Sequence, residues 1–120
     1  MKKISNKNTF KFFDYKWKRV PNWAEITEKK YIKWYLQRYK YKNYKNFKIF
    51  LKDKNLIMEA GCGLARDSKL FAKLNPKAKI IAIDQSKNAI TTAKKIMKDI
   101  KKIHFIQGDI TKKIKIKNKF

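Results

Sequence analysis

The sequence is poor in cysteine, arginine, acidic residues and uninterrupted apolar runs. Its single cysteine, Cys62, excludes an intrachain disulfide, so a reducing cytoplasm is the expected location. No run of about 18 uncharged apolar residues occurs, and we therefore expect no membrane span. The basic N-terminus is not followed by an apolar region, which argues against a signal peptide.

Basic residues outnumber acidic ones by 33 to 9, which gives a formal net charge of +24. Such a charge attracts polyanions and makes binding to them strongly salt-dependent. Arginine, the preferred bidentate reader of phosphate, occurs only at Arg19, Arg38 and Arg66. Lysine, isoleucine and asparagine share A/T-rich codons, so a biased genome explains this composition better than a dedicated nucleic-acid surface. Nonspecific polyanion binding is the most that we expect.

The 120 residues suffice for one domain with a short extension. Residues 1–23 are polar and then aromatic and basic, and we expect them to be irregular or to form a short strand. Residues 25–51 have the pattern of one long and one short helix. An aromatic stripe with helical spacing runs along the first of these helices, and we expect it to pack on a core rather than to stack on bases. Its members are Tyr31, Trp34, Tyr35 and Tyr39.

From residue 55 the pattern changes to short apolar runs alternating with helices. We expect a buried strand at 56–60 and further strands at 78–84 and 103–107, with a helix at 66–74 between the first two. Ser86 is a good N-cap for a further helix whose apolar face extends to Ile100. Strands separated by helices predict parallel pairing with right-handed crossovers. The predicted fold is α/β, a Rossmann-like parallel half-sheet of three strands with flanking helices at 55–120, preceded by an N-terminal helical extension at 1–54.

A glycine turn separates the first predicted strand from its helix. Gly61 and Gly63 permit backbone conformations that a Cβ would oppose, and they let a ligand approach the main chain. The start of the next helix directs free N–H groups and a partial positive charge at the same place, which favours an anionic group by roughly 0.3–1 kcal/mol.

Two classes of adenosine-bearing cofactor use such a turn. The nicotinamide pattern Gly-x-Gly-x-x-Gly/Ala puts Arg66 where a small residue packs between helix and strand, which speaks against that class. The pattern acidic-x-Gly-x-Gly-x-Gly begins at Glu59 and ends at Ala65, a small replacement for the last glycine.

Acidic residues also follow all three predicted strands. Glu59, Asp84 and Asp109 stand at the carboxyl ends of successive strands, the edge at which ligands of open α/β sheets bind. Carboxylates at this edge can accept hydrogen bonds from ribose hydroxyls, each worth roughly 1.5–3 kcal/mol. This arrangement is more specific than the glycines alone.

The run 56–110 resembles the cofactor half of a class I S-adenosylmethionine-dependent methyltransferase. The segments that carry the resemblance are Glu-Ala-Gly-Cys-Gly-Leu-Ala from Glu59, Ile-Asp-Gln-Ser from Ile83, and Gln-Gly-Asp-Ile from Gln107. It implies that Gly61 and Gly63 line the methionine moiety and that Glu59 orients its ammonium. It further implies that Asp84 binds the ribose diol, that Asp109 binds the adenine amine, and that the backbone near Ile110 contacts the ring. The residues expected to bind the cofactor are Glu59, Ala60, Gly61, Cys62, Gly63, Asp84, Gln85, Asp109 and Ile110.

The resemblance implies methyl transfer, by displacement at the sulfonium methyl, to an unidentified acceptor. It identifies no catalytic residue, and we expect no metal site. The sheet of this family continues with further strands, and its substrate-facing motif lies after the fourth. We therefore expect a fragment without the substrate-binding half, one that binds the cofactor weakly on its own.

Two alternatives remain open at this point: a nicotinamide-dependent oxidoreductase and a non-catalytic basic RNA- or DNA-binding protein. Cys62 has no catalytic partners in the sequence, and we expect a loop residue rather than a nucleophile. His104 is expected on a sheet face rather than as a base. Arg66 and Asp67 fit capping and surface roles at the start of a helix, although Arg66 is also placed to reach a cofactor carboxylate.

Overall fold

The computed structural model describes residues 28–114, and the expectations for residues 1–23 lie outside that part of the chain. The elements of the described part alternate between helices and strands after two initial helices. In order they are α2 (Glu28–Arg38), α3 (Tyr44–Lys52), β1 (Leu56–Ala60), α4 (Arg66–Leu74), β2 (Lys79–Asp84), α5 (Lys87–Ile96) and β3 (Ile103–Gln107). None of these helices combines the length and the apolarity that crossing a membrane requires.

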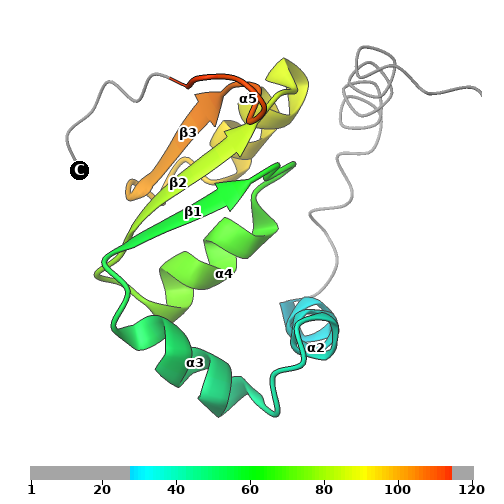
Figure 1. The fold of residues 1–120 in the computed structure, drawn as a ribbon, viewed down its shortest axis with the longest axis vertical. Helices are drawn as coiled ribbons and strands as arrows, with labels where there is room; N and C mark the ends of the chain where they lie inside the picture. The colour runs from blue at the N-terminus through cyan, green and yellow to red at the C-terminus, as the bar shows by residue number, and fades with distance from the viewer. Residues whose placement is uncertain (1–27, 115–120) are drawn as a thin grey trace, which may run out of the picture.

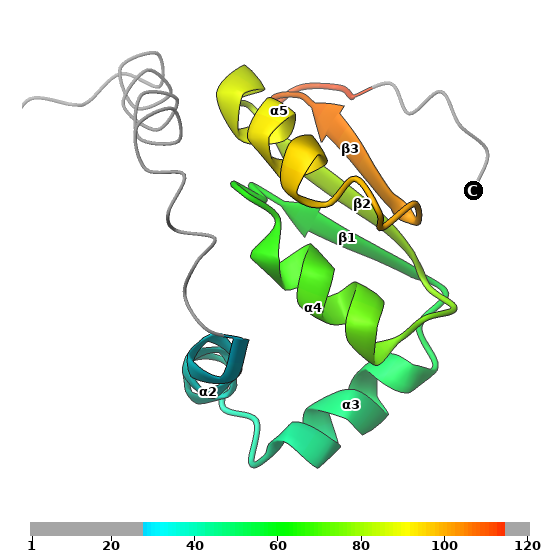
Figure 2. The ribbon, with the colours of Figure 1, turned by 180° about the vertical axis from the view of Figure 1, so that it is seen from behind.

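The three strands form one parallel sheet in the order β1-β2-β3. Met58 is paired with Ile81 in the register of β1 and β2, and Ile81 with His104 in that of β2 and β3. All three strands point the same way, so their carboxyl ends share one edge of the sheet (Figure 1). The crossover helices α4 and α5 both cover the same face (Figure 2). The predicted parallel half-sheet with flanking helices, preceded by a helical extension, is confirmed.

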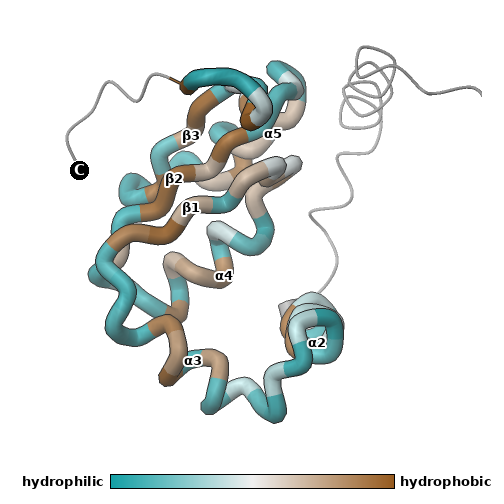
Figure 3. The backbone as a smooth tube through the Cα atoms, in the orientation of Figure 1, coloured by the Kyte–Doolittle hydropathy of each residue, from teal (hydrophilic) through white to brown (hydrophobic). Residues whose placement is uncertain are grey.

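The core lies between the sheet and this helical layer. Ile80 and Ala82 of the central strand are fully buried, as are Ala65 before α4 and Ala93 in α5. Apolar residues concentrate along the strands, whereas apolar and hydrophilic residues alternate along the helices (Figure 3). Burial of such side chains stabilises the fold by roughly 25 cal/mol for each Å² of apolar surface removed from water.

An aromatic cluster joins the N-terminal helices to α4. The ring centroid of Tyr35 in α2 lies 5.0 Å from that of Phe47 in α3 and 6.1 Å from that of Phe71 in α4. The prediction that the stripe packs on a core is right for Tyr31 and Tyr35, whereas Trp34 and Tyr39 are about half exposed. Within the described residues, only one side of α2 therefore packs against other elements.

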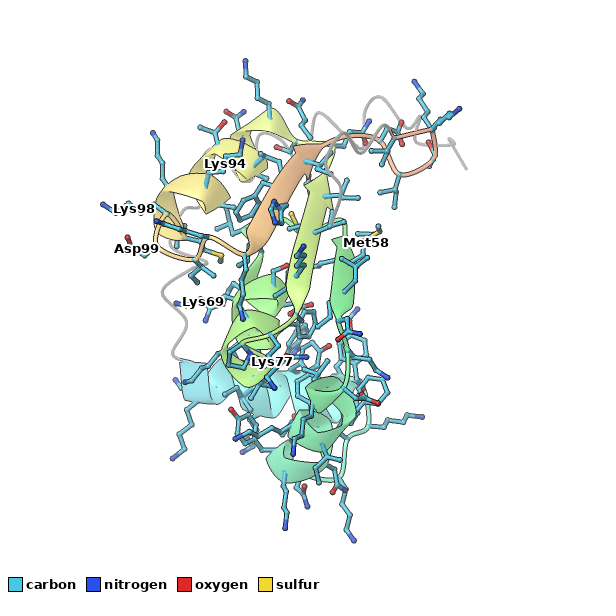
Figure 4. All side chains as sticks on the ribbon, turned by 90° about the vertical axis from the view of Figure 1, so that its left-hand side faces the viewer. Met58, Lys69, Lys77, Lys94, Lys98 and Asp99 are labelled. Carbon is cyan, nitrogen blue, oxygen red and sulfur yellow. The ribbon has the colours of Figure 1, made fainter. Side chains whose placement is uncertain are left out.

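The exposure of β1 differs from the expectation of a buried strand. Leu56 and Met58 are each 53% exposed, while Ile57 and Glu59, which alternate with them along the strand, are half-buried. Met58 points away from α4 and α5 in Figure 4. The difference arises because β1 is an edge strand of the described sheet, and helices cover only one of its two faces.

The helix after Ser86 is shorter than its predicted apolar face, although most of that face is buried. Ser86 caps α5 as expected, because its side chain accepts a hydrogen bond from the N–H of Ala89 at 3.1 Å. The helix ends at Ile96, and Ile96 is 43% exposed although it belongs to the apolar pattern. It lies at the margin of the stripe that Ala93 and Met97 bury against the sheet.

The buried side chain of Asn75 connects three segments where α4 ends. Its Nδ2 donates to the carbonyl oxygens of Leu51 and Lys54, each at 2.7 Å. Its Oδ1 accepts from the backbone N–H groups of Lys77 and Ala78, each at 3.1 Å. One amide thus joins the end of α3, the end of α4 and the start of β2.

We expect Asn75→Ala to lower the free energy of unfolding by roughly 3 kcal/mol, because it leaves buried backbone donors and acceptors without partners. Urea denaturation of the full chain measures this loss. Asn46→Ala, at an exposed asparagine of α3, is the matched control and should change stability by less than about 0.5 kcal/mol. Equal effects of the two substitutions would contradict the structural role of Asn75.

Candidate functional site

The loop between β1 and α4 uses three residues with positive φ. Gly61 (φ 70°), Gly63 (φ 54°) and Ala65 (φ 60°) all lie in the left-handed region. Glycine adopts it freely, whereas alanine does so at a cost of roughly 1–2 kcal/mol. This backbone lets α4 begin a few residues after β1 ends. A Cβ built on Gly61 would meet no atom of the described chain within 4 Å, so the space beside this residue is open to a ligand.

The carboxylate of Glu59 connects the end of β1 to the first turn of α4. Its Oε2 accepts a hydrogen bond from the backbone N–H of Ser68 at 2.9 Å and a second one from Ser68 Oγ. Ala65, at the N-cap of α4, has no side-chain acceptor, so Glu59 satisfies an N–H that the helix itself leaves without a partner. Glu59 therefore caps a helix from a neighbouring strand.

The environment of Glu59 moves its titration toward neutral pH. Burial raises the pKa of Glu59 to about 7, against the lowering effect of the two hydrogen bonds from Ser68. The nearby carboxylate of Asp84 adds a smaller raising effect. A small change in the surroundings of Glu59 is thus enough to change its charge at neutral pH.

Asp84 holds the glycine loop against the end of β2. Its Oδ2 accepts from the N–H of Gly63 and its Oδ1 from the N–H of Ser86, both at 2.8 Å. The N–H of Cys62 also donates to the carbonyl oxygen of Ile83 at 2.8 Å. A carboxylate has about four lone-pair sites, so both oxygens of Asp84 can accept a further hydrogen bond from a ligand hydroxyl.

The end of β3 lies beside the end of β2, because the N–H of Gly108 donates to the carbonyl oxygen of Asp84 at 2.9 Å. Asp109 Oδ1 accepts from Thr111 Oγ1 at 2.6 Å and from the Thr111 N–H at 2.9 Å. These hydrogen bonds hold the pKa of Asp109 below its ordinary value. Of the three predicted carboxylates, the described structure connects Glu59 and Asp84 to the glycine loop and its helix, and it connects Asp109 to Thr111.

The other predicted residues differ in exposure. Ala60, Gln85 and Ile110 are exposed, whereas Cys62 is buried. Burial raises the pKa of the Cys62 thiol well above its ordinary value, which keeps the thiol neutral. This environment agrees with the expectation that Cys62 is a loop residue rather than a nucleophile. His104 lies in β3, as expected for a residue on a sheet face.

Two residues next to the site were not predicted from the sequence. Ser68 is one of them, and its place in the first turn of the helix after an acidic strand end is the signal that could identify it as a partner of Glu59. Tyr31 of α2 was assigned to the core, and the guanidinium carbon of Arg66 lies 4.7 Å from its ring centroid. Arg66 therefore covers an aromatic ring of a distant segment, a contact for which the local sequence gives no signal.

Asp67, in the first turn of α4, is more buried than its predicted surface role implies. Its Oδ1 is buried and has no hydrogen-bond partner in the described structure. Burial raises the pKa of Asp67 to about 6. A carboxyl group with a raised pKa binds its proton more tightly in the folded chain than in the unfolded chain. Ionisation of Asp67 therefore lowers stability as the pH rises toward and through about 6.

We expect Asp67→Asn to stabilise the chain by about 1 kcal/mol at about pH 7.5, allowing for the partial exposure of the group. The difference should vanish near pH 4, where the carboxyl group is protonated in the folded chain. Urea denaturation of both proteins at the two pH values measures this. A difference that does not depend on pH would contradict the assignment.

We expect Asp84→Asn to destabilise the chain by roughly 1–3 kcal/mol, because an amide has one acceptor oxygen for the two N–H donors that the carboxylate satisfies. The control is Asp53→Asn. The Asp53 carboxylate is exposed and lies 3.4 Å from Lys54 Nζ, a surface pair worth less than about 1 kcal/mol. Thermal unfolding of both variants measures the difference. Equal stabilities of Asp84→Asn and Asp53→Asn would contradict the role of Asp84 in holding the loop.

No curated protein sequence matches the chain. Among solved structures it is similar to the plantazolicin methyltransferase BpumL in complex with a triazolic desmethylPZN analog and SAH, at 23% identity and a TM-score of 0.47. The complex of BpumL with a pentazolic analog and SAH gives 24% identity and a TM-score of 0.48. The chain is covered to 89% in both cases but spans only 44% of the length of BpumL.

A family model described as a methyltransferase domain matches residues 51–120. This match covers more than half of the chain, and it includes the glycine loop together with the ends of all three strands. The chain therefore belongs to this methyltransferase domain family.

Proposed function

We propose that the chain binds S-adenosylmethionine at the glycine loop and works in methyl transfer to an acceptor that is not yet identified. The observation that carries this proposal is the pair of carboxylates fixed around one loop. Glu59 is held by Ser68, and Asp84 is held by Gly63 and Ser86. Both have oxygen lone pairs left for a ligand, beside a glycine with open space.

The proposed roles follow from the chemistry of these groups. The loop glycines approach the amino-acid portion of the cofactor, and Glu59 pairs with its ammonium. Asp84 accepts from the ribose hydroxyls, and Asp109 accepts from the adenine amine, with the backbone of Ile110 beside the ring. Ala60, Cys62 and Gln85 complete the proposed set as chain neighbours of these residues.

The residues of the chain contribute binding and orientation. The cofactor, when bound, supplies an electrophilic methyl group on its sulfonium. The carboxylates are fixed by backbone N–H groups before any ligand arrives, so little further ordering is needed on binding. Holding two reactants in line accelerates a displacement without a catalytic side chain. No catalytic base is assigned.

Three further points belong to this proposal. Exposed lysines on all four described helices support nonspecific polyanion binding. The free thiol of Cys62 supports a cytoplasmic location. The division into an extension at 1–54 and a cofactor-binding part at 55–120 is supported by the family match, which begins at residue 51.

We expect the full chain to bind S-adenosylhomocysteine with micromolar or weaker affinity in a calorimetric titration and to give no heat with NADH. Asp109→Ala should weaken this binding about tenfold, because the lost hydrogen bond joins a charged group. Asp99→Ala, at an exposed aspartate outside the proposed site, is the control and should bind as the unchanged chain does.

The outcome of the titration tests the identity of the cofactor and the expected affinity separately. Binding of NADH in place of S-adenosylhomocysteine, or no binding at all, would contradict the proposed cofactor. Submicromolar binding would agree with the cofactor and would contradict the expectation of weak affinity.

A further inference from the structure

Ser68 makes both of its hydrogen bonds with Glu59 to one carboxylate oxygen. The backbone N–H and Oγ of Ser68 both donate to Oε2, and no described residue donates to Oε1. Ser68 is completely buried in the first turn of α4, so its hydroxyl has little freedom to turn elsewhere. The carboxylate is thereby held in one orientation with a defined oxygen left over.

We infer that Ser68 is a positioning residue, which fixes Glu59 so that its second oxygen is presented in ionised form to the ammonium of the cofactor. This inference rests on the proposed function, because it takes the ammonium of the cofactor as the group that Glu59 binds. Ser68 itself touches no ligand in this scheme. It acts through Glu59 by orienting the carboxylate and by favouring its ionised form.

Ser68 favours the ionised form of Glu59 because its hydrogen bonds oppose the effect of burial. Burial disfavours the charged form of Glu59, and the donors of Ser68 favour it. Without the hydroxyl of Ser68, one of these two donors is lost and more of the carboxyl groups are protonated at neutral pH. A protonated carboxyl group offers no charge to an ammonium ion, so binding weakens.

Other titratable groups face the same carboxylate from the neighbouring elements. Asp84 at the end of β2 disfavours ionisation of Glu59, because the two charges have the same sign. Tyr35 of α2 and Cys62 of the loop also interact with the charge of Glu59, and burial raises the pKa of both. These two groups therefore stay neutral around pH 7. Asp67, in the first turn of α4, has a pKa raised to about 6 and ionises toward the lower end of the tested range, so among these groups the change of charge above pH 7 comes from Glu59.

The alternative is that the contact between Glu59 and Ser68 serves only to cap α4. A cap stabilises the helix and would affect every ligand of the site alike. Two probes separate the possibilities, because they share the adenosine and the thioether but differ in the amino acid. S-adenosylhomocysteine carries the ammonium, and 5′-methylthioadenosine lacks it.

The test is calorimetric titration of full-length Ser68→Ala with both probes between about pH 6 and about pH 8.5, around the titration of Glu59. We expect S-adenosylhomocysteine to bind about tenfold more weakly at pH 7, the loss typical of a hydrogen bond to a charged group. The deficit should shrink toward the upper pH limit, where Glu59 ionises even without the hydroxyl. Binding of 5′-methylthioadenosine should not change.

Asn43→Ala is the matched control, because Asn43 caps α3 by accepting from the Asn46 N–H at 2.8 Å and lies on a different helix. It removes a helix cap of similar value and should leave both probes unaffected. Equal weakening of both probes in Ser68→Ala would overturn the inference in favour of a structural cap. Unchanged binding of S-adenosylhomocysteine would overturn it as well.

A direct titration of Glu59 keeps the inference separate from the proposed function. In carbon-13 NMR of the side-chain carboxyl groups, Ser68→Ala should raise the midpoint of Glu59, and Asn43→Ala should not. An unchanged midpoint overturns the inference whatever the ligand. If the unchanged chain binds neither probe, the proposed cofactor is wrong, and the midpoint alone then decides whether Ser68 controls the charge of Glu59.

Discussion

The loop after β1 is held by carboxylates that come from two neighbouring strand ends. The side chain of Asp84 binds the N–H of Gly63, and the side chain of Glu59 binds the start of α4 at Ser68. The backbone continues this connection, since the N–H of Gly108 binds the carbonyl oxygen of Asp84. The three strand ends are thus linked through polar groups. The arrangement of this edge of the sheet therefore depends on the same groups that are proposed to bind the cofactor.

The bounds of several elements could be predicted because a local signal ends each of them. Gly61 follows β1, Asn75 with the following proline ends α4, and Gly108 follows β3, as the structure confirms. The exposure of Met58 could not be predicted in this way. It depends on which sheet faces and edges other elements cover, and an apolar run looks the same in either case.

The candidate site could be predicted only in part, for the same physical reason. Residue type and position at the strand ends indicated Glu59 and Asp84, because parallel strands bring their carboxyl ends together. The partners of these carboxylates are set by how α4 packs against β1, which the sequence does not state. The contact of Arg66 with Tyr31 is a further example, since it requires α2 to lie beside the start of α4.

The raised pKa of Glu59 has a local cause, the removal of its carboxyl group from water. A net charge of +24 favours ionised carboxylates, yet burial still raises this pKa to about 7. The described lysines lie mostly at the surface, where water and salt screen them, while Glu59 is removed from water. The positive charge of the described part lies instead on its surface, where exposed lysines occur on all four described helices.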